Sequence, residues 1–95
     1  MSVLTCVAKI KAKPESENLV KSELMKLIEP TRNEDGCLTY DMHVEINDSS
    51  IFVFYENWET EAHLDRHIES KHVRNCYDSI GDMLESVEVY RLNKV

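Results

Sequence analysis

The segment from Cys37 to Ile46 alternates strictly between two sets of side chains, and this pattern limits the possible folds more than any other feature. The apolar set consists of Leu38, Tyr40, Met42, Val44 and Ile46. A period of two is typical of an antiparallel strand with one buried face. Residues 47–50, Asn-Asp-Ser-Ser, supply turn-forming side chains, and a second apolar run follows from Ile51 to Trp58. The two segments predict a β-hairpin.

The second strand of this hairpin is apolar on both sides. One side carries Ile51, Val53 and Tyr55, and the other carries Phe52, Phe54 and Trp58. A strand of this composition needs a cover on each face. We therefore expect helices on one face of the sheet and a different partner on the other.

The residues before the hairpin predict a strand over 3–12 and a helix that starts near Pro14. Proline fits the first turn of a helix, where its missing N–H is not needed. The apolar residues of this helix recur at helical spacing: Val20, Leu24, Leu27 and Ile28. Pro30 is expected to kink or end the helix, with one more turn through Arg32 as the alternative.

The residues after the hairpin predict two short helices and a last strand. Thr60 and Ser70 are the expected N-caps, because their hydroxyls can accept a bond from a free backbone N–H. The first helix has Leu64, His67 and Ile68 on one face, and the second buries Val73, Cys76, Tyr77 and Ile80. Gly81 should weaken or end the second helix, and residues 86–92 alternate like a strand.

The order β-α-β-β-α-α-β predicts an α+β fold of ferredoxin-like type, with a four-stranded antiparallel sheet and helices on one face. The 95 residues suffice for one core, so residues 1–95 are expected to form a single domain. Either Phe52 and Phe54 or Val53 and Tyr55 would lie on the face that the helices leave open. A large exposed apolar patch usually marks an interface, and we expect a homodimer formed sheet to sheet.

Charge and cysteine content limit the partners. The net charge is −7 and the basic residues are scattered, so neither nucleic acid nor an anionic membrane is an expected partner. No apolar run approaches the roughly 20 residues of a membrane span. Three cysteines without a CxxC pair, and no apolar leader after Met1, predict a reducing, cytoplasmic location.

Several short blocks of the sequence form a further pattern: EDGCLTY at 34–40, FYENW at 54–58, AHL at 62–64 with His67, and SKH at 70–72. Together these blocks resemble the antibiotic biosynthesis monooxygenase family of the dimeric α/β-barrel superfamily. The resemblance covers nearly the whole chain and implies a ferredoxin-like subunit that dimerises through its sheet into a dimeric α/β barrel. Members that this sequence resembles include quinol monooxygenases without metal or organic cofactor, haem-degrading enzymes, an isomerase of a phosphorylated signalling sugar, and proteins without known activity.

The sequence departs from the family pattern at two places. The second His block often has Pro before the His and an aromatic residue after it, whereas Lys71 and Val73 flank His72. The haem-degrading branch has an Asn on its first strand, and residues 3–12 contain none. Haem degradation is therefore not expected.

Oxygenation without a cofactor needs an electron-rich substrate, such as a hydroquinone, whose anion can pass an electron to O₂. The protein must add a base and a dry apolar cavity. His67 and His72 are the candidate catalytic bases, because imidazole titrates near neutrality. The alternatives are a core His67 bonded to a carbonyl and a solvated His72 at a helix start.

Aromatic and amide side chains are candidates for substrate binding. Trp58 can stack on a flat ring, while Tyr40, Tyr55 and Tyr77 can line the pocket or donate to an oxyanion. Each of them has core packing as its alternative. Asn57 can bind a substrate oxygen, but it lies on the opposite side of its strand from Trp58, so the two cannot line one cavity.

No cofactor and no metal are expected. His63 and His67 have the spacing of a metal pair, with Glu56 or Cys76 as further ligands, but the usual nearby acid is missing. A nucleophilic Cys37 or Cys76 beside His72 lacks any sign of a lowered thiol pKa. Neither pattern supports a metal enzyme or a thiol enzyme.

The function predicted is a cofactor-independent monooxygenase that acts on a quinol-like or phenolic small molecule. The first alternative is an isomerase of a phosphorylated sugar, which would need a phosphate contact from Arg32, Arg66 or Arg74. The second is a non-catalytic dimeric module that binds a small ligand.

Overall fold

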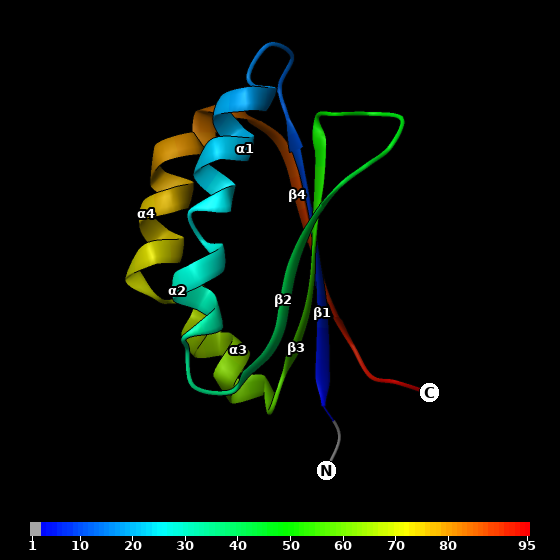
Figure 1. Cartoon of the computed structure of the whole chain (residues 1–95), viewed down its shortest axis with the longest axis vertical. Coiled ribbons are helices and arrows are strands. Elements are labelled where there is room, and N and C mark those ends of the chain that lie inside the picture. Colours follow the sequence, from blue (N-terminus) through cyan, green and yellow to red (C-terminus); the bar gives the residue numbers. More distant parts are fainter. Residues whose placement is uncertain (1–2) are drawn as a thin grey trace.

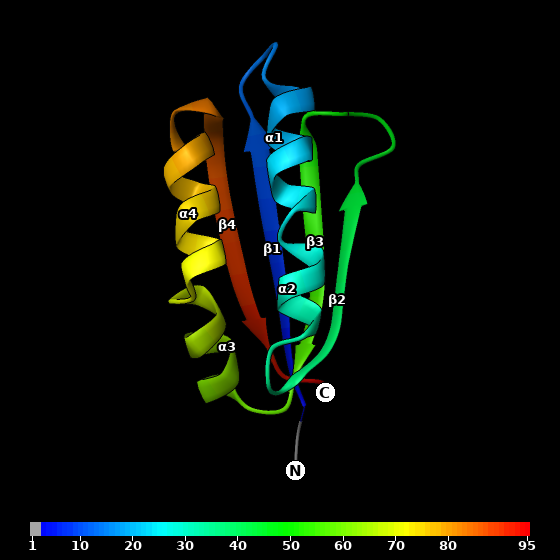
Figure 2. The same ribbon diagram turned by 60° about the vertical axis from the view of Figure 1, so that its left-hand side comes forward.

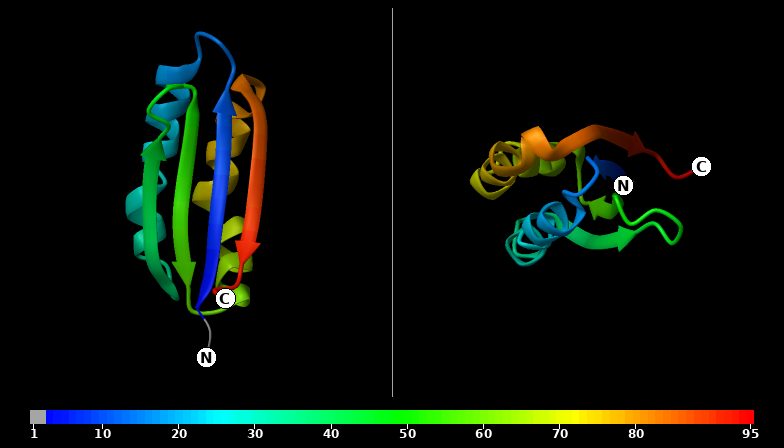
Figure 3. Two further views of the ribbon diagram at one scale, coloured as in Figure 1. Left: turned by 90° about the vertical axis from the view of Figure 1, so that its right-hand side faces the viewer. Right: turned by 90° about the horizontal axis from the view of Figure 1, so that it is seen from above.

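A computed structural model describes residues 3–95, and its four strands form one antiparallel sheet in the order β2-β3-β1-β4. The strands are β1 (Leu4–Ala12), β2 (Cys37–Val44), β3 (Ile51–Trp58) and β4 (Leu84–Leu92). Strand β1 lies between β3 and β4 and is antiparallel to both. The left view of Figure 3 looks onto the face of the sheet that carries no helix.

All helices lie on the other face of the sheet (Figure 1). They are α1 (Glu17–Met25), α2 (Ile28–Arg32), α3 (Glu61–Ile68) and α4 (Lys71–Ile80), and a 3₁₀ turn over Gly81–Met83 leads into β4. Helices α1 and α2 lie over the β2–β3 side, and α3 and α4 lie over the β1–β4 side (Figure 2). The predicted ferredoxin-like α+β fold is confirmed. No helix in the described part of the chain is long and apolar enough to cross a membrane.

The first helical region differs from the prediction at its start and at its break. Glu15 has a φ of 71°, a left-handed conformation that no helix can include, so α1 begins at Glu17 instead of near Pro14. The break falls at Lys26 and Leu27, before Pro30. Pro30 is the third residue of α2, a first-turn position where its missing N–H removes no helical bond. The extra turn through Arg32 is this short helix.

Of the two predicted N-caps, one makes a capping hydrogen bond and the other does not. Thr60 caps α3, because its Oγ1 accepts the backbone N–H of His63 at 3.3 Å. Ser70 occupies the N-cap position of α4, but its hydroxyl donates to the carbonyl of His67 at 2.6 Å and makes no cap bond. The Ser70 hydroxyl thus links the start of α4 to the last turn of α3 and does not cap α4.

Strand β2 does not alternate strictly, because a bulge at Leu38 interrupts its pairing with β3. Cys37 pairs with Trp58 and Thr39 pairs with Asn57, which leaves Leu38 as the extra residue. As a result Cys37 packs against the core, whereas Leu38 is 53% exposed. The strand also ends at Val44, so Ile46 lies beyond it and is exposed. Of the predicted apolar face, Tyr40 and Met42 remain at the core.

Strand β3 settles which of its sides the helices cover. Its buried residues are Phe52, Phe54, Glu56 and Trp58. Val53 and Tyr55 lie on the open face, as one of the two predicted alternatives has it. The core therefore lies between this single covered face and the helices, and it contains a glutamate.

Candidate functional site

A cavity of about 590 Å³ lies between the sheet and helices α3 and α4. Most of its lining is apolar, including Ala8, Phe54, Leu64, Val73, Val87 and Val89. The polar groups are Cys6, Tyr40, Glu56, His67 and Tyr77, with Arg74 and Asp78 on the exposed side of α4. Val87 and Val89 of β4 are 44% and 50% exposed although they lie on the helix side of the sheet. A cavity of this size and composition is typical of a site for a small, mostly apolar ligand.

Glu56 is the only carboxyl group that the structure, over residues 3–95, places in the buried part of this cavity lining. Glu56 is 3% exposed, and its Oε1 accepts a hydrogen bond from the indole N–H of Trp58 at 2.9 Å. Burial raises the pKa of Glu56 to about 7; the bond from Trp58 opposes this shift, and the negative charge of Glu34 adds to it. A carboxyl group with this pKa can both take and return a proton near neutral pH.

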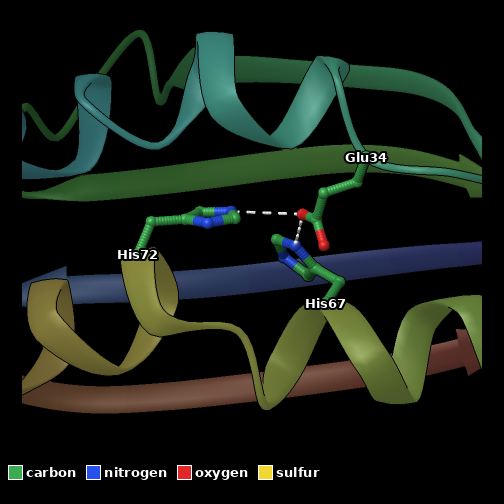
Figure 4. Close-up of side chains that lie close together, drawn as sticks. All are labelled: Glu34, His67 and His72. Carbon is green, nitrogen blue, oxygen red and sulfur yellow. Dashed lines mark hydrogen bonds and ion pairs between the residues drawn. The ribbon is translucent and has the colours of Figure 1, made fainter.

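His67 lines the same cavity, and the carboxylate of Glu34 contacts its ring (Figure 4). Its Nδ1 lies 2.6 Å from Oε2 of Glu34. Because a carboxylate only accepts, Nδ1 carries the proton and Nε2 is the unprotonated nitrogen of the neutral ring. Burial lowers the pKa of His67, although the bond and the charge of Glu34 act in the opposite direction. Burial is the larger effect, so the ring is neutral, and the bond to Glu34 fixes its tautomer.

Two aromatic rings fix the orientation of the His67 imidazole. The Trp58 ring centroid lies 4.9 Å from that of His67, and the Tyr40 ring meets it edge-on at 5.4 Å. Tyr40 in turn stacks on Phe54 at 4.9 Å. Trp58 thus contacts both acid–base candidates, Glu56 and His67, without itself lining the cavity.

His72 joins the Glu34–His67 pair but does not line the cavity. Its Nε2 lies 3.1 Å from the same Oε2 of Glu34, 3.2 Å from Oγ1 of Thr31 and 3.4 Å from Oγ of Ser70. It sits in the first turn of α4, facing the loop after α2 (Figure 4). The structure therefore brings the two predicted catalytic histidines together, yet places only His67 at the cavity.

The predicted substrate-binding residues divide between the two faces of the sheet. Tyr40 and Tyr77 line the cavity, and burial raises the pKa of both phenols, so they are hydrogen-bond donors at neutral pH. Tyr55 and Asn57 point to the open face: Tyr55 is 44% exposed, and the Oδ1 of Asn57 accepts from the hydroxyl of Thr5 at 2.8 Å. Strand alternation separates them from Glu56 and Trp58, as predicted for Asn57, and Tyr55 does not line this cavity.

The remaining candidates occupy other surroundings. His63 does not pair with His67, because its Nδ1 lies 2.7 Å from the hydroxyl of Thr60 and its Nε2 lies 3.5 Å from Asp35. Of the three arginines proposed for a phosphate, Arg74 lines the cavity, while Arg32 pairs with Asp41 at 3.0 Å.

The three cysteines are free thiols. Burial raises the pKa of Cys6 to about 12 and that of Cys37 and Cys76 to about 11. The thiolate, which is the reactive form, is therefore disfavoured at each position. This gives no support to a cysteine nucleophile.

Sequence reasoning missed the roles of two acidic residues. Glu56 occupies an inward position of β3, between Phe54 and Trp58, and that parity was the available signal for a buried acid. Glu34 lies in the loop after α2, where no periodicity places a side chain. Only the folded chain shows that it faces two histidines from α3 and α4.

The fold and this cavity define a small α+β protein with a buried glutamate and a buried histidine at one cavity, and its class follows from its similarity to known proteins. The family model "Antibiotic biosynthesis monooxygenase" matches residues 3–79, and the chain belongs to this family. The crystal structure of PA3566 from Pseudomonas aeruginosa is similar over 100% of this chain and 96% of that chain, with a TM-score of 0.95 and 33% identity.

Two relatives show the same similarity at the level of sequence. Rv0793 of Mycobacterium tuberculosis is 31% identical over 83 residues, which cover 87% of this chain and 81% of that protein. The protein named "Probable quinol monooxygenase YgiN" of Escherichia coli K12 is 28% identical over 94 aligned positions, covering 87% of this chain and 90% of YgiN.

Proposed function

We propose that this protein is a cofactor-independent monooxygenase that acts on a quinol-like or phenolic small molecule. The observation that carries the proposal is the pairing of Glu56 with Tyr40, Tyr77 and His67 around one largely apolar cavity. Such a substrate needs a base for its phenolic proton and donors for its anion, and these groups supply both. Family membership and the similarity to YgiN support the same reaction class.

In the proposed reaction Glu56 takes the phenolic proton, and the resulting phenolate passes one electron to O₂. The ring radical and superoxide then form a C–O bond at an adjacent ring carbon, and Glu56 returns the proton to the outer peroxide oxygen. Loss of the ring hydrogen and cleavage of the O–O bond release water. The sum is quinol plus O₂ giving hydroxyquinone plus water, which balances without an external reductant.

The chain's other polar groups have defined parts in this reaction. The phenols of Tyr40 and Tyr77 can donate to the substrate oxyanion, since their raised pKa keeps them protonated. The Nε2 of His67 can accept a hydrogen bond from a second substrate hydroxyl. Glu34 acts through His67 as a positioning residue. The apolar side chains exclude water, which strengthens each of these interactions.

The test is oxygen uptake with a panel of hydroquinones and naphthoquinols in the presence of a chelator. We expect the wild type to exceed the autoxidation rate and Glu56→Gln to lower kcat by about 10²- to 10⁴-fold. Asn57→Ala is the matched control, because Asn57 directly follows Glu56 in β3 but points to the open face, away from the cavity. Wild-type uptake no faster than autoxidation with every quinol would contradict the proposal and favour the isomerase or the ligand-binding module.

We further propose that the protein is a homodimer formed through the open face of the sheet. The support is the apolar content of that face, which includes Val53 and Tyr55 on β3, Val7 on β1, and Tyr90 and Leu92 on β4. Sedimentation at micromolar concentration tests this, and a single monomeric species would contradict it. A reducing cytoplasmic location remains a prediction from the cysteine content.

A further inference from the structure

We propose that Glu34, His67 and His72 form a binding site for a divalent transition-metal ion of the Zn²⁺ type. The three side chains come from separate parts of the chain: the loop after α2, helix α3 and the first turn of α4 (Figure 4). One ligand atom from each lies within 4.8 Å of the other two. Two imidazole nitrogens and one carboxylate oxygen are a common donor set for this class of ion.

Two of the three donor distances require only a small adjustment, and the two histidine nitrogens lie within 4.8 Å of each other. Zn²⁺ holds nitrogen and oxygen ligands at about 2.0–2.2 Å, so tetrahedral donors stand about 3.3 Å apart. Oε2 of Glu34 lies 2.6 Å from Nδ1 of His67 and 3.1 Å from Nε2 of His72. The Glu34 carboxylate must therefore withdraw by less than about 1 Å from His67. Glu34 lies in a loop, where such a movement breaks no helix or strand bond.

The surroundings favour a cation at this place. The His67 ring is already oriented by Trp58 and Tyr40. The hydroxyls of Thr31 and Ser70 lie 3.2 Å and 3.4 Å from Nε2 of His72, where they can hold a water on the fourth metal position. The net charge of −7 also attracts a positive ion.

The ion would lie behind His67, on the side away from the cavity. Glu34 and His72 do not line the cavity, and His67 would bind the ion through Nδ1, the nitrogen that now faces Glu34. A neutral imidazole that gives Nδ1 to a metal carries its proton on Nε2. Metal binding would therefore change the cavity-facing nitrogen from an acceptor into a donor. This inference concerns binding, and its test does not depend on the proposed reaction.

The experiment is a titration of chelator-treated full-length protein with Co²⁺, followed by its visible d–d spectrum. We expect one equivalent to give the intense bands of tetrahedral cobalt, and Zn²⁺ to remove them by competition. ¹⁵N NMR of the His67 ring should show the shift of the proton from Nδ1 to Nε2 when Zn²⁺ binds. A hydrogen-bonded cluster without affinity for metal would show neither change.

Variants assign the ligands. Glu34→Gln and His72→Ala should each weaken Co²⁺ binding more than about 100-fold, a larger loss than that caused by changing a residue outside the ligand set. His43→Ala is the control, because His43 is an exposed histidine on β2. His72→Gln is the second ligand variant if circular dichroism shows that His72→Ala does not fold. Retained binding in a folded His72 variant, or an equal loss in His43→Ala, would overturn the proposal.

Discussion

The two faces of the sheet carry different chemistry although the same strands build both. On the covered face β3 contributes Phe52, Phe54, Glu56 and Trp58, each 3% exposed or less. On the open face the same strand contributes Val53, Tyr55 and Asn57, and Tyr55 is 44% exposed. Adjacent residues therefore belong to different environments. The burial that shifts the pKa of Glu56 and fixes its hydrogen bond exists on one face only.

Because of this difference, the covered face mainly determines the stability of the folded chain, and the open face mainly determines its association with another surface. Buried side chains of the covered face contribute to folding of the single chain, because they leave water when the helices pack on the sheet. Apolar side chains of the open face contribute mainly when another surface covers them. Substitutions on β3 can therefore measure the two contributions separately.

The largest effect is expected for truncation of a covered aromatic residue. Trp58→Ala should lower the free energy of unfolding by about 3–5 kcal/mol, because it leaves a large cavity and removes the partner of Glu56. Tyr55→Ala is the matched control and should cost less than about 1 kcal/mol in the monomer. Denaturant unfolding at one low protein concentration makes the measurement. Equal losses would mean that the open face is as well packed as the covered one.

The pH dependence of stability tests the burial of Glu56 directly. Its pKa in the folded chain is raised from 4.5 to about 7, so the folded state holds the proton more tightly than the unfolded state does. Relative to Glu56→Gln, the wild type should therefore be most stable below pH 4.5. It should lose about 3 kcal/mol as the pH rises to about 7 and above.

Urea unfolding of both proteins at several pH values measures this difference. Glu59→Gln, at an exposed position just after β3, is the comparison variant and should keep the wild-type dependence. If wild type and Glu56→Gln show parallel curves, Glu56 is not buried as the structure has it.

A smaller loss is expected for Gly36→Ala, at the loop that carries Glu34 to the covered face. Gly36 has a φ of 83°, and an added Cβ would clash with the ring of His63. The left-handed backbone alone costs about 1–3 kcal/mol for a residue that disfavours it. Gly81→Ala is the control, since a Cβ there meets nothing within 4 Å and the backbone is right-handed. Thermal unfolding of both variants should show a lower Tm for Gly36→Ala alone.

The smallest effect on folding is expected for Val53→Glu on the open face. Val53 pairs with Lys9 of β1 and His43 of β2, so a glutamate there meets no negative neighbour across the strands. The monomer should change by less than about 0.5 kcal/mol. If the homodimer forms through this face, the same variant should sediment as a monomer. An unchanged dimer would show that its interface lies elsewhere.

The sequence is sufficient to predict the fold because side-chain periodicity reports on backbone geometry. Period two in the sequence of β2, the apolar run of β3 and helical spacing in α4 predict the elements, and the element order limits the topology. The bulge at Leu38 was not predictable in this way, since one extra residue leaves the apolar pattern of β2 intact. The start of α1 depended on the left-handed Glu15, which no composition rule indicates.

The site is predictable only in part for a related reason. His67 shares a helical face with Leu64, so its inward direction follows from spacing. The link from Glu34 to His67 and His72 joins residues 33 and 38 positions apart, and such contacts depend on how the loop after α2 packs against α3 and α4. Long-range pairing of this kind is a property of the tertiary fold.

The bulge in β2 determines which residue of this strand a relative can lack without turning its other side chains over. Cys37 and Tyr40 both face the helices, although an odd number of steps separates them, because Leu38 takes no place in the ladder. Removing residue 38 would restore regular pairing and leave both side chains on the same side as before. An alignment gap at this position therefore preserves the phenol at the cavity, whereas a regular strand that kept all residues from 37 to 40 would turn Tyr40 toward the opposite surface from Cys37.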